Sequence, residues 1–550
     1  RALVLRRELA APGRFRWAGG QPSWYPPTEG GSCVQPRSRT MDVQQYIETL
    51  RLLPSSRSST AGGGSGFADV LTGKAAILHP QSALLLTMVS LGFVYSVHNL
   101  IAPNMTAIAS RFHFNNFERD EFIGGELTLI FYLPGIFVAL ICGVLSAFCS
   151  RRLLFTVAMI TTALSCFSTA FAANFTQLAW ARMFTGVGIG GALPIVYSLV
   201  GDWFPPEKRT VGSAMVTASC GAGVFGGQLI ATVVGAGDWR WPFVVISVPM
   251  LLLGAMLFLT TEDPQRGGAE QSIQSLRQHT GMDYFPQMST RHIKTVFANR
   301  TNALVILQAF PGCVPWGVII VYLHDYLVQD IGLTRQESLA AVGILGTGAL
   351  VGVFIGGCVG EWLYAYDSRF LTAFCSAATV FRVVPFCFIF GWTGLDPAGS
   401  LASHTSFMVV LFLGGVVSTM PSPGIGAMLL NVNLPETRGT VFAFYSILDD
   451  LSKGFGTLFV SMIVPYVGGR AAAYRLALII WVFCGFALAP TWFTLPLDEA
   501  AMRTHLNDAA MESVVRVSKR QAAQQVTQRC KAAGDAFAKE RDNRKPVRWV

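Results

Sequence analysis

The sequence predicts an all-α membrane protein with twelve transmembrane helices in two pseudo-symmetric six-helix halves. Its 550 residues are 52% hydrophobic and only 13% charged, with a mean hydropathy of +0.46, whereas soluble domains carry about a quarter charged residues. Twelve apolar runs are each close to the ~20 residues that cross a bilayer. The motif Pro206-Glu207-Lys208-Arg209 is echoed by Pro435-Glu436-Thr437-Arg438, and a repeat at such a distance indicates a duplicated half.

The apolar runs define the elements in chain order. We place the spans at residues 82–103, 124–147, 153–173, 177–200, 211–234, 242–260, 302–323, 338–360, 370–392, 405–428, 439–466 and 471–495. The resulting regions are a disordered basic N-terminal region (1–81), a first half (82–260), a cytosolic central linker (261–301), a second half (302–495) and a basic cytosolic C-terminal tail (496–550). Residues 1–40 precede the first methionine, so they are either a translated leader, with the composition of a transit peptide, or part of a longer protein.

The charges in the loops predict the orientation. With both termini on one side of the membrane, the loops of that side hold eleven Lys and Arg residues and the opposite loops hold five. The positive-inside rule makes the richer side cytosolic. We therefore expect a multi-pass integral membrane protein with both termini in the cytosol, in the plasma membrane or an organelle membrane.

Composition argues against several functional classes. The net charge of +9 lies mainly in the tails and in the loops of one side, which is not the pattern of a nucleic-acid-binding patch. The eleven cysteines are scattered, with no CxxC pair and no His/Cys cluster, so we expect no metal and no cofactor. The sequence contains neither an HExxH nor a GxSxG motif, and we expect that the protein is not an enzyme. The expected partners are a small-molecule or lipid substrate and the bilayer, with no nucleic acid, and the chain is expected to be a monomer.

Matched glycines and arginines mark the cytosolic ends of two spans. Gly143 precedes Arg152 by the same spacing as Gly360 precedes Arg369. A glycine lets two helices approach, whereas ordinary positive-inside placement explains the arginines alone. Together with the echoed motifs, these positions form a predicted cytosolic gate in which acids and arginines make charge contacts. Its members are Gly143, Arg151, Arg152, Asp202, Glu207, Arg209, Glu361, Arg369, Glu436 and Arg438.

Two spans are rich in glycine. The fifth contains Gly223 and Gly227, and the eighth contains a ladder with a four-residue period, made of Gly348, Gly352, Gly356 and Gly360. Glycines at this period form a smooth groove for a neighbouring helix. We expect these two helices to form a movable interface between the halves; static tight packing is the alternative.

Ionisable residues inside the spans predict the substrate or coupling site, because a charge in hydrocarbon is costly. Asp449, Asp450 and Lys453 lie ~16–22 Å into the eleventh span, near the middle of the membrane. Lys453 is spaced to pair with either acid, which leaves one carboxylate for proton coupling. The alternative is a structural ion pair beside a solvated acid.

Three further residues are candidates for the same site. Arg182, in the fourth span, either faces a cavity or reaches the membrane interface with its long side chain. His98, in the first span, is either a hydrogen-bonded structural histidine or a proton carrier. Glu126 stands near the outer start of the second span.

These elements together resemble the major facilitator superfamily over residues 82–495. The matches are the segment from Gly143 to Arg152, Arg182-x-x-Thr185-Gly186 in the fourth span, the glycine-rich fifth span and the long central loop. The segments 201–209, 237–243 and 262–267 resemble the spinster-like branch. The resemblance implies secondary transport by alternating access of a small organic solute, or of a lysolipid- or sphingolipid-like amphiphile. Proton coupling and facilitated diffusion both stay open, and the alternative is a non-transporting receptor or scaffold on a carrier fold.

Several family positions depart from the pattern. The acid of the loop after the second span is replaced by Ala147, and its counterpart in the second half is Tyr364. The glutamate of the spinster-like fourth span is replaced by Ile189. The family's usual carboxylates are therefore missing, which makes Asp449 and Asp450 the candidates for coupling and Glu361 the candidate for the gate acid.

Overall fold

The computed structural model describes residues 78–115, 118, 122, 123, 126–280, 294, 296–391 and 405–508. The predicted N-terminal region up to residue 77, linker residues 281–293 and the tail from residue 509 lie outside the described residues. Every regular element in the described part of the chain is a helix.

The first half contains six spans joined by short loops. In chain order its main helices are α4 (Pro80–Ser96), α5 (Met105–Arg111), α7 (Leu127–Leu145), α8 (Arg151–Thr169), α9 (Phe175–Gly190), α10 (Ala192–Trp203), α11 (Arg209–Val233) and α12 (Trp241–Thr260). The short helices η1 (Val97–Asn99) and η2 (Ala102–Asn104) lie between α4 and α5, and η4 (Pro206–Lys208) lies before α11. The side chains of Ser150 and Asn174 cap α8 and α9, which explains where these helices begin.

The second half follows the linker helix α13 (Gln271–Thr280). Its helices are α15 (Arg300–Gly312), α16 (Val314–Gln329), α17 (Arg335–Tyr366), α18 (Ser368–Phe381), α19 (Val383–Ile389), α20 (Thr405–Thr419), α21 (Ser422–Asn431), α22 (Arg438–Ile463), α23 (Arg470–Leu478) and α24 (Ile480–Leu488). Residues 491–508 form one more helix. The breaks after α15 and after α20 fall at the proline pairs 311/315 and 421/423, because proline lacks the backbone N–H that a continuous helix needs.

Eleven helical segments of the described chain are long and apolar enough to cross a membrane. α22 is not among them because Asp449, Asp450 and Lys453 fall inside one stretch of it. It nevertheless runs for 26 residues between two of the eleven segments. Counting α22, the described helices fit the predicted twelve spans.

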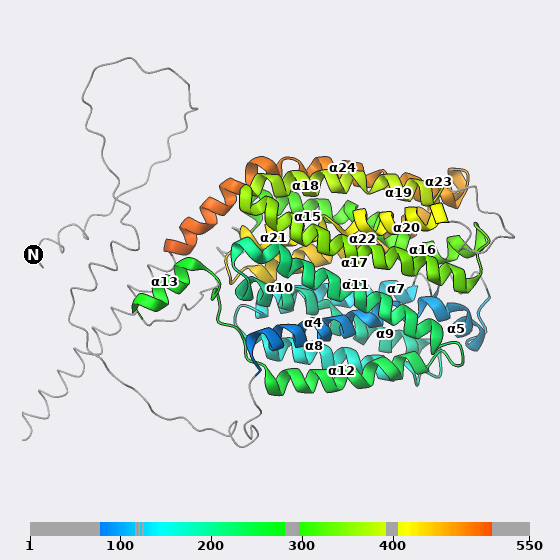
Figure 1. Cartoon of the computed structure of the whole chain (residues 1–550). Coiled ribbons are helices and arrows are strands. Elements are labelled where there is room, and N and C mark those ends of the chain that lie inside the picture. The colour runs from blue at the N-terminus through cyan, green and yellow to red at the C-terminus, as the bar shows by residue number, and fades with distance from the viewer. Residues whose placement is uncertain are drawn as a thin grey trace, which may run out of the picture. The chain divides into compact units, whose positions relative to one another are not determined.

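The helices pack as two groups with a seam between them. In Figure 1 the blue to green helices lie together, and the yellow-green to orange helices lie beside them. Within the groups, α8 packs against α9 and α12, and α17 packs against α20. Across the seam, α22 contacts α7 and α10, and α11 contacts α17 and α21. The eleventh and fifth spans therefore make the main contacts with the opposite half.

The glycine ladders lie mainly inside each half, contrary to the expectation of an interface between halves. A Cβ at Gly223 or Gly227 would overlap the backbone of α4, in the same half. A Cβ at Gly348 or Gly352 would overlap a carbonyl group of α20, and a Cβ at Gly356 would overlap that of Met420 just after it, also in the same half. These five glycines serve static tight packing, because backbone is in contact with backbone and cannot move aside.

Among the glycines singled out in the sequence, Gly143 and Gly360 face the opposite half. A Cβ at Gly143 would lie 2.7 Å from the carbonyl oxygen of Gly439 in α22, and a Cβ at Gly360 would lie 2.6 Å from Cγ2 of Thr210 in α11. The two matched loop motifs thus make equivalent contacts across the seam. Their common spacing reflects a common packing role.

Two adjacent glycines of α11 allow a controlled test of this packing. We expect Gly227→Ala to destabilise the purified protein by about 1–3 kcal/mol or more, because the added methyl group overlaps the carbonyl oxygen of Ser96. Gly226→Ala should be neutral or stabilising, since nothing lies within 4 Å of its Cβ position. Thermal unfolding in detergent measures both, and equal melting temperatures for the two variants would contradict the assignment.

Candidate functional site

The charged turn of α22 lies in the interior of the bundle. Lys453 forms an ion pair with Asp449, and its Nζ lies 3.8 Å from Oδ1 of Asp450. The thiol of Cys313, at the break between α15 and α16, donates a hydrogen bond to the other oxygen of Asp449. Asp449 therefore has two close partners, the lysine and the thiol. Asp450 interacts with the same lysine at a greater distance.

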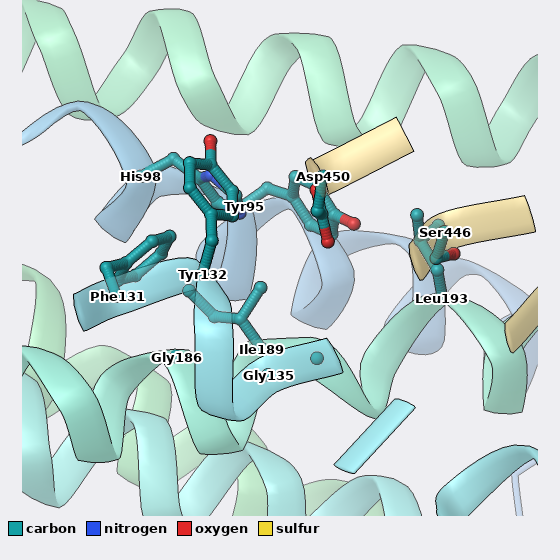
Figure 2. A pocket seen from close by; sticks show the side chains of 11 residues that line it. Tyr95, His98, Phe131, Tyr132, Gly135, Gly186, Ile189, Leu193, Ser446 and Asp450 are labelled. Carbon is teal, nitrogen blue, oxygen red and sulfur yellow. The ribbon is translucent and has the colours of Figure 1, made fainter. Parts of the chain in front are cut away.

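Asp450 lines a small, partly open cavity. The cavity lies between the halves, because α22 contributes two of its residues and helices of the first half contribute the others. The lining residues are Tyr95, His98, Phe131, Tyr132, Gly135, Gly186, Ile189, Gly190, Leu193, Ser446 and Asp450. Figure 2 shows the aromatic rings gathered at one end, with Asp450 and Ser446 toward the other.

The rings around His98 form one continuous cluster. His98 stacks on Tyr95 with 4.9 Å between ring centroids, and it meets the edge of Phe131 at 5.2 Å. Tyr132 lies at 5.0 Å from Phe131 in an edge arrangement. Nε2 of His98 and Oγ of Ser446 are buried and have no hydrogen-bond partner in the described part of the chain. Two polar atoms at the cavity are thus available to a ligand.

Arg182 lies behind the cavity wall. Its side chain is 4% exposed, so it does not reach the membrane interface, and it is not among the residues that line the cavity. Its guanidinium group lies 4.5 Å from the ring centroid of Phe131 and donates a hydrogen bond to the carbonyl oxygen of Val97 at 3.3 Å. Arg182 therefore acts on the cavity only through Phe131 and through its charge. Glu126, the N-cap residue of α7, is exposed and lies outside the cavity.

The tertiary structure adds residues that sequence reasoning did not select. Tyr95, Tyr132 and Ser446 read as ordinary members of apolar helices, although Ser446 stands one helical turn before Asp450 and so shares its face. A second buried guanidinium, that of Arg382 between α18 and α19, lies 4.3 Å from the ring centroid of Trp481. Residues almost a hundred positions apart form this pair, so the sequence offered no local sign of it.

A second polar site closes the predicted cytosolic end of the bundle. We call its main members, Arg151, Asp202, Arg209, Glu270 and Arg438, the gate cluster. Arg209 and Arg438, from the two echoed motifs, both form ion pairs with Glu270 of the linker. The three side chains are at most 5% exposed. One carboxylate thus joins the first half, the second half and the linker.

The gate cluster preserves the duplication of the halves. Arg438 of the second half donates to Oδ1 of Asp202 in the first half at 3.4 Å. Arg209 of the first half donates to Oδ1 of Asn431 in the second half at 3.0 Å. Asp202 precedes Arg209 by the same spacing as Asn431 precedes Arg438. The two arginines therefore make equivalent reciprocal contacts, with an amide in place of one carboxylate.

The start of the linker is bound to the first half. Asp202 pairs with Arg151 and accepts the backbone N–H of Gly267 at 2.9 Å. Asp263 accepts the backbone N–H groups of Arg151 and Arg152 at 2.9 and 2.7 Å, which caps the N-terminus of α8. The guanidinium of Arg152 lies 5.2 Å from the ring centroid of Phe258. The linker is thus part of the closed end.

Two sequence expectations about the gate acids need correction. Glu207 was expected to pair at the gate, but it is exposed in η4, where the helix presents no buried residue. Glu361 was expected to replace the missing loop acid, but the acid that joins the arginines is Glu270. Arg369 is exposed at the start of α18, where Asp367 caps its backbone N–H. Glu436, in contrast, is buried.

The helix at residues 491–508 also contributes an acid to this end. The hydroxyl of Tyr364, which stands where the family has an acid in the second half, donates to Oε1 of Glu499 at 3.0 Å. Asp498 accepts hydrogen bonds from the backbone N–H and the hydroxyl of Thr301 at 2.8 and 2.7 Å. An acid that α17 lacks is thus supplied from the C-terminal helix.

The electrostatics of Glu270 depend on its two arginines. Burial alone raises the pKa of Glu270, and the adjacent guanidinium groups of Arg209 and Arg438 outweigh burial, so its pKa falls from 4.5 to about 2. Glu270 is therefore ionised throughout the physiological range. Breaking a buried ion pair by removing one partner typically costs about 3–5 kcal/mol.

A family model described as Major Facilitator Superfamily matches residues 84–397. The chain belongs to this superfamily. This transporter is 26% identical over 396 residues to the inner membrane metabolite transport protein YgcS of Escherichia coli (strain K12), a match covering 69% of this chain and 83% of the relative. It is 24% identical to the hexuronate transporter of Bacillus subtilis (strain 168), over 63% and 80% of the two chains.

Two further comparisons concern the branch and the fold. The transporter is 21% identical to the sphingosine-1-phosphate transporter SPNS2 of Danio rerio, over 51% of this chain and 56% of that one. The crystal structure of the human organic anion transporter MFSD10 aligns with a TM-score of 0.56 and 16% identity, covering 75% of this chain and 100% of that chain. The family model confirms the resemblance to the major facilitator superfamily that the motifs predicted. The protein is a multi-pass membrane transporter of small solutes and not an enzyme.

Glu270 provides a test of the closed end. We expect Glu270→Gln to lower the stability of the transporter by about 3–5 kcal/mol, because two buried guanidinium groups lose their carboxylate. Since the pKa of Glu270 in the folded protein is about 2, this contribution is present above about pH 4.5 and is lost as the pH falls toward 2. Melting temperatures measured across this range should therefore converge for the wild type and the variant. Glu207→Gln, at an exposed residue, is the control and should change neither the melting temperature nor its dependence on pH.

The Tyr364–Glu499 contact can be tested with a double-mutant cycle. Tyr364→Phe should cost about 1–3 kcal/mol, because a buried carboxylate loses one of its hydrogen-bond donors. In a Glu499→Met background the same change should cost much less, since the partner is already gone. Tyr366→Phe, at a tyrosine that is 80% exposed, is the matched control. Additive costs in the cycle would show that the two side chains do not interact.

Proposed function

We propose that the transporter is a proton-coupled symporter of a small organic anion, which binds in the central cavity and crosses by alternating access. The observation that carries the proposal is the position of Asp450. It lines the cavity, and it shares Lys453 with Asp449, which is the better-held acid. A carboxylate that contacts the cavity and lacks a full partner is the group best placed to take up a proton.

The charge balance of the core favours an anion. Among the described residues in the interior of the spans, the cations are Arg182, Arg382 and Lys453, and the anions are Asp449 and Asp450. The core therefore carries a net charge of about +1 when both acids are ionised. A positive charge in a low-dielectric region is offset by an anionic ligand, whereas a cationic ligand would add to its cost.

The same balance explains how a proton and an anion travel together. Binding of an anion beside Asp450 disfavours the ionised carboxylate, so Asp450 takes up a proton. The loaded core, with Asp450 neutral and one anion bound, then has the same net charge as the empty core with Asp450 ionised. Both forms can cross between the two orientations at a similar electrostatic cost.

The relatives favour a metabolite over a lipid. The metabolite transport protein and the hexuronate transporter match over more of this chain than the sphingosine-1-phosphate transporter does. Hexuronate and sphingosine-1-phosphate, named for two of the relatives, are both anions, which supports the charge assignment. Of the two substrate classes predicted from the sequence, we therefore propose the small organic solute and not the lysolipid.

We further propose the orientation predicted from the loop charges. The gate cluster and both termini then face the cytosol, with the linker at residues 261–301 on the same side. The assignment of residues 82–260 and 302–495 to the two moving halves belongs to this proposal, as does a monomeric state. The orientation is supported by the arginines at this end of the bundle, because the positive-inside rule places such residues on the cytosolic side.

Transport in proteoliposomes tests the proposal. With an inward proton gradient, we expect uptake of small organic anions above the protein-free background. Asp450→Asn should keep exchange of anion across the membrane but lose accumulation driven by the gradient, because its side chain cannot take up a proton. Asp330→Asn, which breaks a partly exposed pair with Arg470, is the control and should keep both activities.

Three results would contradict the proposal in different ways. Full gradient dependence in Asp450→Asn would exclude this residue as the proton site. Unchanged uptake and unchanged substrate range in Arg182→Ala would remove the contribution of that cation to anion selection. No flux of any solute through the wild-type protein would favour a non-transporting receptor on a carrier fold.

A further inference from the structure

The central cavity has two chemically different ends. At one end lie the rings of Tyr95, His98, Phe131 and Tyr132 (Figure 2). At the other end lie Asp450 and Ser446, one helical turn apart on α22 (Figure 2). A ligand that fills this cavity therefore meets aromatic rings and Nε2 of His98 at one end, and a carboxyl and a hydroxyl group at the other.

Tyr132 has the ring best placed to receive a planar ligand. Tyr95 and His98 are stacked on each other with an interplanar angle of 13°, so one face of each ring is covered. One face of Phe131 is covered by the guanidinium of Arg182. Tyr132 meets Phe131 and His98 at angles of 78° and 52° and stacks on neither. A ligand ring can pair with it in an offset-stacked or edge arrangement.

Three glycines form a stretch of bare backbone in the cavity wall, which we call the glycine floor. Gly135 of α7 and Gly186 and Gly190 of α9 line it, and these helices touch so closely that a Cβ at Gly186 or Gly190 would overlap the backbone of α7. No side chain of these three residues projects into the space. Ile189 and Leu193 also line the cavity, but the glycine floor itself leaves room for a flat ring beside the aromatic side chains.

The polar end is suited to a carboxylate. Ser446 is 5% exposed, and its buried hydroxyl has no hydrogen-bond partner among the described residues, so it has a donor to offer. A protonated Asp450 offers a second donor, and Lys453 lies 3.8 Å behind it. A carboxylate can accept both hydrogen bonds with its two oxygens. Most other lining residues at this end are apolar, which leaves few partners for a polyhydroxylated solute.

From these features we infer that the substrate is a small planar aromatic monocarboxylate. Its ring lies against Tyr132, over the glycine floor, and its carboxylate accepts hydrogen bonds from Ser446 and protonated Asp450. This inference rests on the proposed function, since it names the substrate class of the same cavity. No bond is made or broken, and the proton on Asp450 is shared in a hydrogen bond with the ligand.

A matched pair of acids tests the inference with the full chain in proteoliposomes. Labelled 4-hydroxybenzoate is the probe, and 4-hydroxycyclohexanecarboxylate and glucuronate compete with it under an inward proton gradient. The two hydroxy acids have the same number of non-hydrogen atoms, but only one is planar. We expect the aromatic acid to compete at a concentration about three- to tenfold lower than its saturated analogue, the range that an aromatic contact contributes, and glucuronate to compete more weakly than either.

Variants locate the preference. Tyr132→Leu should bring the ratio between the two hydroxy acids close to one, while Tyr132→Phe should retain it. Ser446→Ala should weaken the binding of both hydroxy acids by a similar factor. Tyr466→Leu, at a tyrosine that is 86% exposed, should leave the ratio unchanged. The comparison of ligands on the wild-type protein needs no variant, so it stands even where Tyr132→Leu does not fold.

The outcomes separate this inference from the proposed function. Proton-driven uptake of the saturated acid or of glucuronate, without a preference for the planar acid, would overturn the inference and leave the symport proposal intact. If no organic anion is taken up in a proton-dependent way, both the inference and the symport proposal are overturned. A preference for the planar acid that survives in Tyr132→Leu would show that another surface reads the ring, and would overturn the assigned site.

Discussion

The cost of holding charge in a low-dielectric core governs the arrangement of this transporter. α22 carries two acids and a lysine through the interior, and the structure gives them unequal surroundings. Asp449 is held by Lys453 and Cys313, which leaves Asp450 at the cavity. The buried guanidinium groups of Arg182 and Arg382 are covered by aromatic rings instead of carboxylates. The core thus retains a positive charge that a passing anion can offset.

The cavity and the gate cluster are mechanically connected through the same helix. Arg438 begins α22 at the closed end, and Asp450 stands on it about 18 Å further along. Because the helix is continuous between them, a displacement of Arg438 from Asp202 and Glu270 also moves Asp450. Opening of the predicted cytosolic end therefore changes the cavity at the same time, which is what alternating access requires.

Segments outside the two halves complete the closed end. Glu270 comes from the linker, and Glu499 comes from the helix after the last span. Ile273 of the linker, Met502 and Leu506 form a small apolar cluster beside them, with Leu434 packed against it. The family acids missing at Ala147 and Tyr364 are thus compensated by acids elsewhere in the chain.

The sequence by itself determined the twelve spans, the duplication and the charged face of α22, because hydropathy, repeat spacing and helical period are local properties. It also located His98 and Asp450, which both line the cavity. Only the tertiary structure decided which partners these groups have. Glu270, and not the expected Glu207 or Glu361, pairs with the gate arginines. The glycine ladders pack against helices of their own half, and Tyr132 and Ser446 line the cavity. Each of these outcomes depends on contacts between segments far apart in the chain, and no local pattern encodes such contacts.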